Sequence, residues 1–168
     1  MTGAARVVVK SRRLVVVEVL IPGTTTADVY SAVCDVGRMA EWSPEAQGVW
    51  TGPDAIRVGD VFGGANQRGR RTWSTTCRVT RAQPDQGFAF DVTSGPFPVS
   101  AWGYEFTTEG ASVRVRETWT DARDGARGWV ITLLGVLATG VTNRAEHNAT
   151  TMTITLNRLR LALQGTTA

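Results

Sequence analysis

Apolar and polar positions alternate through the middle of the chain and follow a helical period near its end. Residues 14–21 form an apolar run of mostly β-branched residues that Pro22 and Gly23 stop, which predicts a first strand. From residue 47 to about residue 123 the period is two. This period predicts further strands near 47–51, 60–66, 70–82, 87–94, 99–108 and 112–123. Short turns rich in glycine, proline and aspartate separate them, as in an antiparallel meander.

Two short helices are predicted between the first strand and the meander. Thr24–Asp28 places hydroxyl groups and an acid at a helix start. The apolar positions that follow share one helical stripe, formed by Val29, Ala32, Val33 and Val36. We expect Gly37 to end this helix and a second short helix to begin within Met39–Trp42.

The C-terminal part has a helical pattern from about residue 125 to residue 163, which is longer than an ordinary globular helix. Gly135 and Gly140 are places where it can kink or divide, so one helix and two helices both stay open. Its mainly apolar stripe consists of Leu137, Val141, Ala145, Asn148, Met152, Leu156, Leu159 and Leu163.

One sheet with an alternating apolar face needs an element to cover that face, and the terminal helix is the longest one predicted. The sequence therefore predicts an α+β fold. A curved antiparallel sheet of about seven strands wraps around a long C-terminal helix, with two short helices after the first strand. The space between sheet and helix is the expected site for a small apolar molecule. We expect one domain over residues 1–168.

Composition excludes several classes of function. The chain is 42% hydrophobic with a net charge of +3, and its basic residues are spread rather than clustered, so no nucleic-acid partner is expected. Cys34 and Cys77 lie far apart in sequence and are expected to be free thiols. With one histidine in the chain there is no ligand cluster at metal-binding spacing, so neither a metal nor a cofactor is expected.

Nothing in the sequence predicts a targeting signal or a membrane span. The apolar run at residues 14–21 contains Glu18 and is better interpreted as a strand than as a signal peptide. Residues 129–141 are apolar but shorter than the about 20 residues that cross a bilayer. We expect a cytoplasmic protein without stable membrane insertion. Its oligomeric state stays open, a homodimer included.

Period two also assigns side chains to the inner or the outer face of the sheet. Between residues 113 and 121 the odd positions are mainly apolar, so Glu117 shares the inner face with Val115 and Trp119. A carboxylate there is costly unless it is paired, protonated or hydrated. The same reasoning turns further strand side chains inward: Phe62, Asn66, Trp73, Thr75, Phe90, Trp102 and Tyr104.

Two interpretations of Glu117 stand side by side. It forms a buried structural ion pair with Arg144 or Arg71, or it contacts the ligand and exchanges protons with it. Trp42 has the same ambiguity, because it either fills the corner between the short helices or touches the ligand. His147 lies at the flank of the terminal helix stripe and is expected at the rim or in solvent.

Several segments fit the pattern of one known family. In the helical regions they are Ala27–Tyr30, Asp35, Met39–Pro44, Arg144, Asn148, Met152 and Leu156–Leu159. In the strands they are Gly59–Asn66, Trp73–Val79, Pro84, Phe88–Phe90, Trp102–Phe106 and Val115–Trp119. With these segments the chain resembles the polyketide cyclase/dehydrase group of the START-like (SRPBCC, helix-grip) superfamily. The resemblance implies the fold; members use the cavity for cyclisation, dehydration, ligand carriage or sensing.

The first functional hypothesis is a cofactor-independent enzyme that resembles polyketide cyclases or dehydratases. Glu117 would act as general acid/base, and Tyr104, Asn66 and Arg144 would polarise carbonyl or enolate oxygens. We therefore take Glu117, Tyr104 and Arg144 as candidate catalytic residues. The candidate ligand-binding residues are Trp42, Phe62, Asn66, Trp73, Thr75, Phe90, Trp102, Trp119, Asn148 and Met152.

The alternative hypothesis is a non-catalytic binding or carrier protein for a hydrophobic ligand or lipid, which needs only the apolar lining and one or two orienting polar groups. A membrane-associated lipid-transfer domain is a third interpretation, in which residues 129–141 would lie at the mouth of the cavity. In each case the partner is a small hydrophobic molecule held in an internal cavity.

Overall fold

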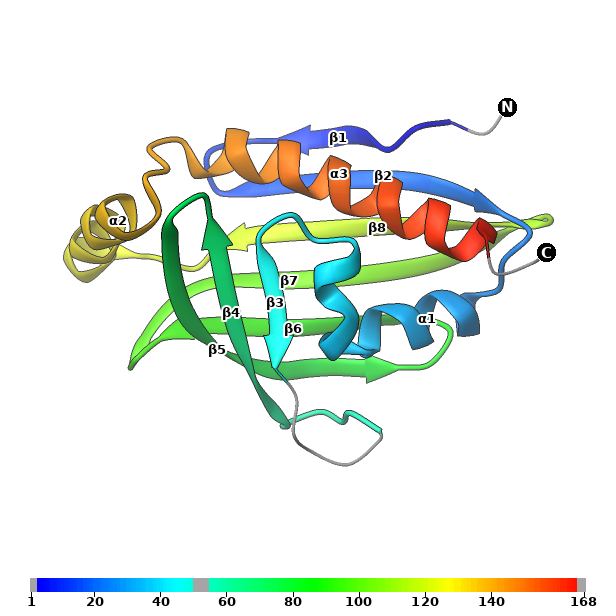
Figure 1. Cartoon of the computed structure of the whole chain (residues 1–168), viewed down its shortest axis with the longest axis horizontal. Helices are drawn as coiled ribbons and strands as arrows, with labels where there is room; N and C mark the ends of the chain where they lie inside the picture. The colour runs from blue at the N-terminus through cyan, green and yellow to red at the C-terminus, as the bar shows by residue number, and fades with distance from the viewer. Residues whose placement is uncertain (1–2, 50–54, 166–168) are drawn as a thin grey trace.

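The computed structural model describes residues 3–49 and 55–165, and these form one eight-stranded antiparallel sheet with helices against it (Figure 1). The sheet order is β1-β2-β8-β7-β6-β5-β4-β3. Its strands are β1 (Arg6–Lys10), β2 (Leu14–Pro22), β3 (Ala46–Val49), β4 (Val61–Arg68), β5 (Arg71–Gln83), β6 (Gly87–Ser94), β7 (Phe97–Glu109) and β8 (Ser112–Asp121). The strands from β3 to β8 follow one another as a meander, and β2 closes the order by pairing with β8.

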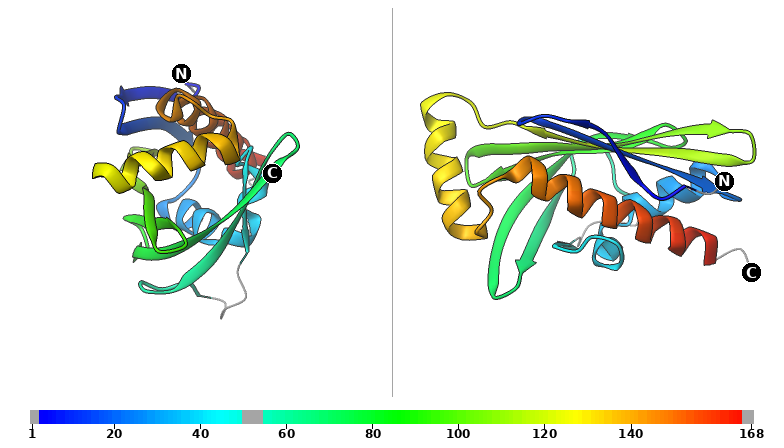
Figure 2. Two further views of the ribbon diagram at one scale, coloured as in Figure 1. Left: turned by 90° about the vertical axis from the view of Figure 1, so that its left-hand side faces the viewer. Right: turned by 90° about the horizontal axis from the view of Figure 1, so that it is seen from above.

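The helices are α1 (Thr26–Cys34), the 3₁₀ helix η1 (Val36–Glu41), α2 (Gly125–Thr139) and α3 (Arg144–Gly165). The curved sheet wraps around α3, which runs along its strands, while α2 lies across one end of the sheet (Figure 2). The predicted α+β helix-grip architecture is confirmed. None of the helices in the described parts of the chain is both long and apolar enough to cross a membrane.

The hydrophobic core lies where α3 packs against β2. The helix turns Met152, Leu156 and Leu159 toward the sheet, and all three are buried. On β2, Val15 and Val17 are fully buried as well. Burial of these apolar side chains holds the sheet and the helix together, at about 25 cal/mol per Å² of apolar surface removed from water.

The start of α1 confirms the predicted helix signal. Thr25 is the N-cap, and its hydroxyl accepts a hydrogen bond from the Asp28 amide, while the Asp28 carboxylate accepts one from the Thr25 amide. This reciprocal pair is a capping box. The helix ends at Cys34, before Gly37, which lies inside η1; the expectation that Gly37 ends the first helix is wrong.

The structure adds a strand that the sequence pattern did not predict. β1 pairs with the outer edge of β2, and its five residues are all exposed. Because both faces of β1 are exposed, Val7, Val8 and Val9 follow one another without the alternation that marks a half-buried strand. At β3, residues 46–49 confirm most of the strand predicted near 47–51, and residues 50 and 51 lie outside the described residues.

The C-terminal helical region consists of two helices that Gly140 separates. Gly140 has φ +71°, a left-handed conformation, and its amide donates to the carbonyl of Val136 to cap α2. Glycine takes this conformation without the steric cost that a side chain imposes. Leu137 therefore belongs to α2, where it is exposed, and does not extend the buried stripe of α3.

Leu156 tests how far the sheet depends on α3. We expect Leu156→Ala to lower the free energy of unfolding by about 2–5 kcal/mol, because it leaves a cavity at a position with 0% exposure. Leu161→Ala, on the exposed side of the same helix, should change it by about 0.5 kcal/mol or less. Urea unfolding followed by circular dichroism measures both. Equal losses of unfolding free energy in the two variants would show that α3 does not pack against the sheet through Leu156.

Candidate ligand cavity

A cavity of about 330 Å³ lies between the inner face of the sheet, α2 and α3. Its walls are mainly apolar and aromatic. The strands contribute Phe62, Asn66, Trp73, Thr75, Cys77, Phe90, Val92, Val99, Trp102, Tyr104, Glu117 and Trp119. The helices contribute Leu134, Gly135, Thr139, Arg144, Asn148, Thr151, Met152 and Thr155. A cavity of this size and lining suits a small, largely apolar molecule.

All but one of the residues predicted to form the site line this cavity. The exception is Trp42, which is buried in the hydrophobic core with the Arg38 guanidinium 5.6 Å from its ring, while Met39 and Ser43 reach the cavity. A tryptophan that fills a corner and one that contacts a ligand look alike in sequence, because both are large apolar residues between polar ones. The structure places Trp42 at the corner.

Strand register brings Glu117 and Tyr104 together. The two residues are directly opposite each other on β8 and β7, and Val17 of β2 is the opposite neighbour of Glu117 on its other side. The Tyr104 hydroxyl donates a hydrogen bond of 2.8 Å to Oε1 of Glu117. Two residues further along the same two strands, Trp102 lies opposite Trp119. Glu117 thus lies in a row of apolar and aromatic side chains on the inner face.

Burial determines the protonation of Glu117. Its side chain is 2% exposed, and desolvation raises its pKa to about 8, while the hydrogen bond from Tyr104 lowers it only in part. Burial also raises the pKa of Tyr104 well above its ordinary value, so the phenol keeps its proton and donates it to Oε1. Among the described residues Oε2 has no hydrogen-bond partner. Near neutral pH the carboxyl is therefore mainly a neutral acid with its second oxygen free.

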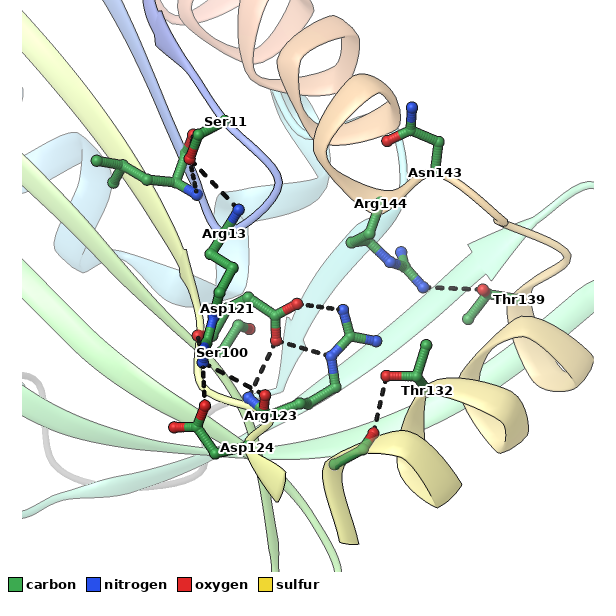
Figure 3. Close-up of polar contacts among 12 residues, drawn as sticks. Ser11, Arg13, Ser100, Asp121, Arg123, Asp124, Thr132, Thr139, Asn143 and Arg144 are labelled. Atoms are coloured by element: carbon green, nitrogen blue, oxygen red, sulfur yellow. Dashed lines mark hydrogen bonds and ion pairs between the residues drawn. The ribbon is translucent and has the colours of Figure 1, made fainter. Parts of the chain in front are cut away.

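The predicted ion pair of Glu117 with Arg144 or Arg71 is not formed. Arg144 donates from Nη2 to Oγ1 of Thr139 at 2.8 Å, and Arg71 donates to the carbonyl of Leu137 (the first contact is drawn in Figure 3). Both arginines therefore form hydrogen bonds with the C-terminal end of α2. The sequence pattern could not reveal this, because the turn at Gly140 brings α2 to these side chains.

Asn66 and Asn148, both predicted to bind the ligand, differ in whether the side-chain Nδ2 group already forms a hydrogen bond. The Nδ2 group of Asn66 donates to the carbonyl of Gly64 at 3.1 Å, so it is already used within the sheet. Asn148 on α3 is buried, and its Nδ2 has no partner among the described residues. Asn148 Nδ2 and Glu117 Oε2 are thus two buried polar atoms on cavity-lining residues that have no hydrogen-bond partner among the described residues.

The cavity also holds charged residues that the sequence analysis missed. Arg123 forms a 2.6 Å ion pair with Asp121, from just beyond the end of β8 (Figure 3). Burial raises the pKa of Asp121, but hydrogen bonds and charge from Arg123 outweigh this and lower it overall. Glu45 is the second charged cavity-lining residue that the sequence analysis missed. Its carboxylate accepts a hydrogen bond of 2.7 Å from His147 Nε2. Both Arg123 and Glu45 are outside strands, where period two no longer assigns a direction.

No group of three or more histidine, cysteine, aspartate or glutamate side chains gathers in residues 3–49 and 55–165 in a way that would hold a metal ion. A neutral carboxyl, an amide donor and aromatic walls can bind a carbonyl oxygen, polarise it and exchange a proton with it.

Fold and site together define a helix-grip protein with an internal cavity. Residues 12–159 match the family described as "Polyketide cyclase / dehydrase and lipid transport", and the chain belongs to this family. No curated protein matches it in sequence.

Solved structures agree with this assignment. The chain is similar to the polyketide-cyclase-like protein Cgl2372 of Corynebacterium glutamicum, with 26% identity, 89% of this chain and 91% of that chain covered, and a TM-score of 0.58. It has the fold of the di-domain ARO/CYC protein StfQ of the steffimycin biosynthetic pathway, with 15% identity, 91% and 51% covered, and a TM-score of 0.59. DynU16, a putative protein in the dynemicin biosynthetic locus, shares the fold at 16% identity, 90% and 47% covered, and a TM-score of 0.53.

The raised pKa of Glu117 predicts how stability depends on pH. The unfolded chain releases this proton near the ordinary value of 4.5, whereas the folded protein keeps it until about pH 8. The contribution of Glu117 to the free energy of unfolding is therefore fully present below pH 4.5 and is lost as the pH rises through about 8. Glu117→Gln cannot ionise, so we expect it to be more stable than the wild type at about pH 9, on the order of a few kcal/mol, but not at about pH 4.

Urea unfolding of the wild type and Glu117→Gln across this pH range measures the difference. Glu105→Gln is the matched control, because Glu105 is exposed on the same sheet and pairs with Arg81 at its surface. It should follow the wild type. A stability difference between Glu117→Gln and the wild type that does not change with pH would contradict the raised pKa.

Proposed function

We propose that the protein is a cyclase- or dehydratase-type enzyme that acts on a polyketide or a similar hydrophobic intermediate within the cavity, with Glu117 as general acid/base. One observation carries this proposal. Glu117 is a buried carboxyl whose pKa is raised to about 8, and its Oε2 is free on a residue that lines the cavity. A pKa close to the pH of the surroundings is what a group needs to give and take a proton in one reaction cycle.

The chemistry follows from the two free polar atoms. The proton on Oε2 of Glu117 and the Nδ2 group of Asn148 can donate to a ketone oxygen and make its carbon electrophilic. When an enol carbon of the same chain attacks, a carbon–carbon bond forms and the ketone oxygen takes the proton from Glu117. The carboxylate left behind takes the enol proton, which restores the acid and balances the step.

Dehydration uses the same group in the opposite order. The Glu117 carboxylate removes a proton from the carbon beside a carbonyl, and the enolate then expels the neighbouring hydroxyl, which leaves as water with that proton. Both forms of Glu117 are accessible near its pKa of about 8. Tyr104 donates to Oε1, so it acts as a positioning residue that leaves Oε2 to the substrate.

The walls of the cavity would also increase the rate, because they bind and orient the substrate. Trp102 and Trp119 are opposite each other on neighbouring strands and offer aromatic surface for an unsaturated chain. A cavity that holds one folded conformation of a flexible chain lowers the barrier by fixing the reacting carbons, an effect worth on the order of several kcal/mol. Exclusion of water protects a reactive poly-ketone from side reactions.

A non-catalytic binding protein is the second candidate. The family description includes lipid transport, and the mainly apolar lining with few polar groups is sufficient for carriage. In a carrier the neutral Glu117 would only donate a hydrogen bond to the ligand. The two candidates differ in what becomes of the bound molecule, because a carrier returns it unchanged.

Glu117→Gln tests the proposed chemistry, because glutamine keeps the size and a hydrogen-bond donor but cannot transfer protons. We expect turnover of poly-β-ketone thioester mimics, followed by mass spectrometry of the cyclised or dehydrated product, to fall about 10²–10⁴-fold. Thermal stabilisation by the same compounds should be retained. Glu105→Gln, on the outer face, should be as active as the wild type. Unchanged turnover by a folded Glu117→Gln protein would remove Glu117 from the mechanism.

Tyr104→Phe tests the positioning role. Loss of the donated hydrogen bond removes the contribution that lowers the pKa of Glu117, so the pKa should rise further. We expect the basic limb of the pH–rate profile to move to higher pH, with a smaller loss of turnover than in Glu117→Gln. A profile identical to that of the wild type would show that Tyr104 does not act on Glu117.

A further inference from the structure

We propose that the α2 end of the cavity binds an oxyanion of the ligand on Arg144, so that the ligand has a carbonyl at Glu117 and an acidic group at its other end. This inference rests on the proposed function, because it assumes that an apolar carbonyl compound occupies the cavity. It assigns Arg144 a binding role in place of the carbonyl-polarising role expected from the sequence.

Arg144 is a largely buried cation without an ion pair. Its one hydrogen bond in the described structure goes to the neutral hydroxyl of Thr139. No carboxylate of the described residues lies within ion-pair distance of it. Burial lowers the pKa of Arg144. The negative charges of Glu45 and Asp121 act against this effect and the positive charges of Arg123 and Arg68 add to it, but an arginine still keeps its proton. A charge held in this way is costly unless an anion joins it.

The nearest carboxylates are already committed to other partners. Asp121 holds the guanidinium of Arg123 through two contacts, at 2.6 and 2.8 Å (Figure 3). Glu45 accepts from His147 at 2.7 Å and lies 3.8 Å from Arg68. Of the two arginines that line the cavity, Arg123 and Arg144, Arg144 is the one that forms no ion pair among the described residues.

A second, polar groove gives the oxyanion room and further positive charge. It measures about 610 Å³, and its lining includes Arg12, Arg13 and Asp121; Arg13 forms an ion pair with Asp124 at 2.6 Å. Arg123, Gly135 and Arg144 line both the groove and the apolar cavity, so the two spaces meet at these residues. Gly135 has no side chain that would separate the groove from the cavity. The acidic end of a ligand at Arg144 would therefore face a basic, polar space while its apolar body stays in the cavity.

The two subsites lie at different positions along both β8 and α3. β8 runs from Glu117 toward α2 and rises about 14 Å by Asp121, beside the arginines. On α3, Asn148 is about 6 Å further from α2 than Arg144.

A matched pair of fluorescent probes tests this arrangement. 8-Anilinonaphthalene-1-sulfonate is an apolar body with an oxyanion, and N-phenyl-1-naphthylamine is the same body without the charge. We expect the wild type to bind the sulfonate more tightly. Arg144→Gln should weaken the sulfonate about tenfold or more and leave the neutral probe within about twofold. Arg144→Lys should keep most of the preference, and Arg57→Gln, at an exposed position outside both spaces, should keep all of it.

The outcomes separate this inference from the function on which it rests. If Arg144→Gln leaves the ratio of the two affinities unchanged, or weakens both probes equally, there is no oxyanion subsite, while the cavity remains a ligand site. If neither probe binds the wild type, the proposed ligand cavity fails as well. The melting temperature of each variant, measured by circular dichroism, shows that the comparison is made on folded protein. Arg144→Gln should melt no earlier than the wild type, because it removes an unpaired buried charge.

Discussion

A carboxyl group removed from water organises this protein's cavity. Glu117 lies on the inner face of the sheet between Val17 and Tyr104, and one phenolic hydroxyl is its hydrogen-bond partner. The absence of a cation among its described contacts keeps it neutral, and the fold bears the cost of a buried polar atom at Oε2. Asp121, on the same face four residues later, has Arg123 as a partner and a lowered pKa. Two carboxyls on one strand are thus pushed to opposite protonation states, which is the arrangement that acid–base sites exploit.

The sequence predicts the fold and the inner wall because both depend on local periodicity. Period two identifies the strands of the meander, and the odd positions of β8 turn Glu117 inward beside Trp119. Trp102, Tyr104 and Phe90 follow by the same rule on their own strands. Each of these assignments needs only the distance along one strand, which the order of residues contains.

What the sequence does not predict depends on contacts between distant segments. Arg144 and Arg71 turn to α2 because Gly140 reverses the chain there, so neither pairs with Glu117. Trp42 packs in a corner, and Arg123 enters the cavity from beyond a strand end. β1 lacks alternation because both its faces are exposed. In each case the determining neighbour comes from another element, and hydrophobic period carries no information about it.

The protonation state of Glu117 is the central claim, and a direct titration tests it most closely. Carbon-13 NMR of protein labelled in the glutamate side-chain carboxyl, with Glu117→Gln to assign the signal, follows this group alone across pH. The account predicts a neutral carboxyl at neutral pH and a midpoint of about 8. A midpoint near the ordinary value of 4.5 would show that Glu117 is a charged residue in the folded protein, and the proposed acid would not exist.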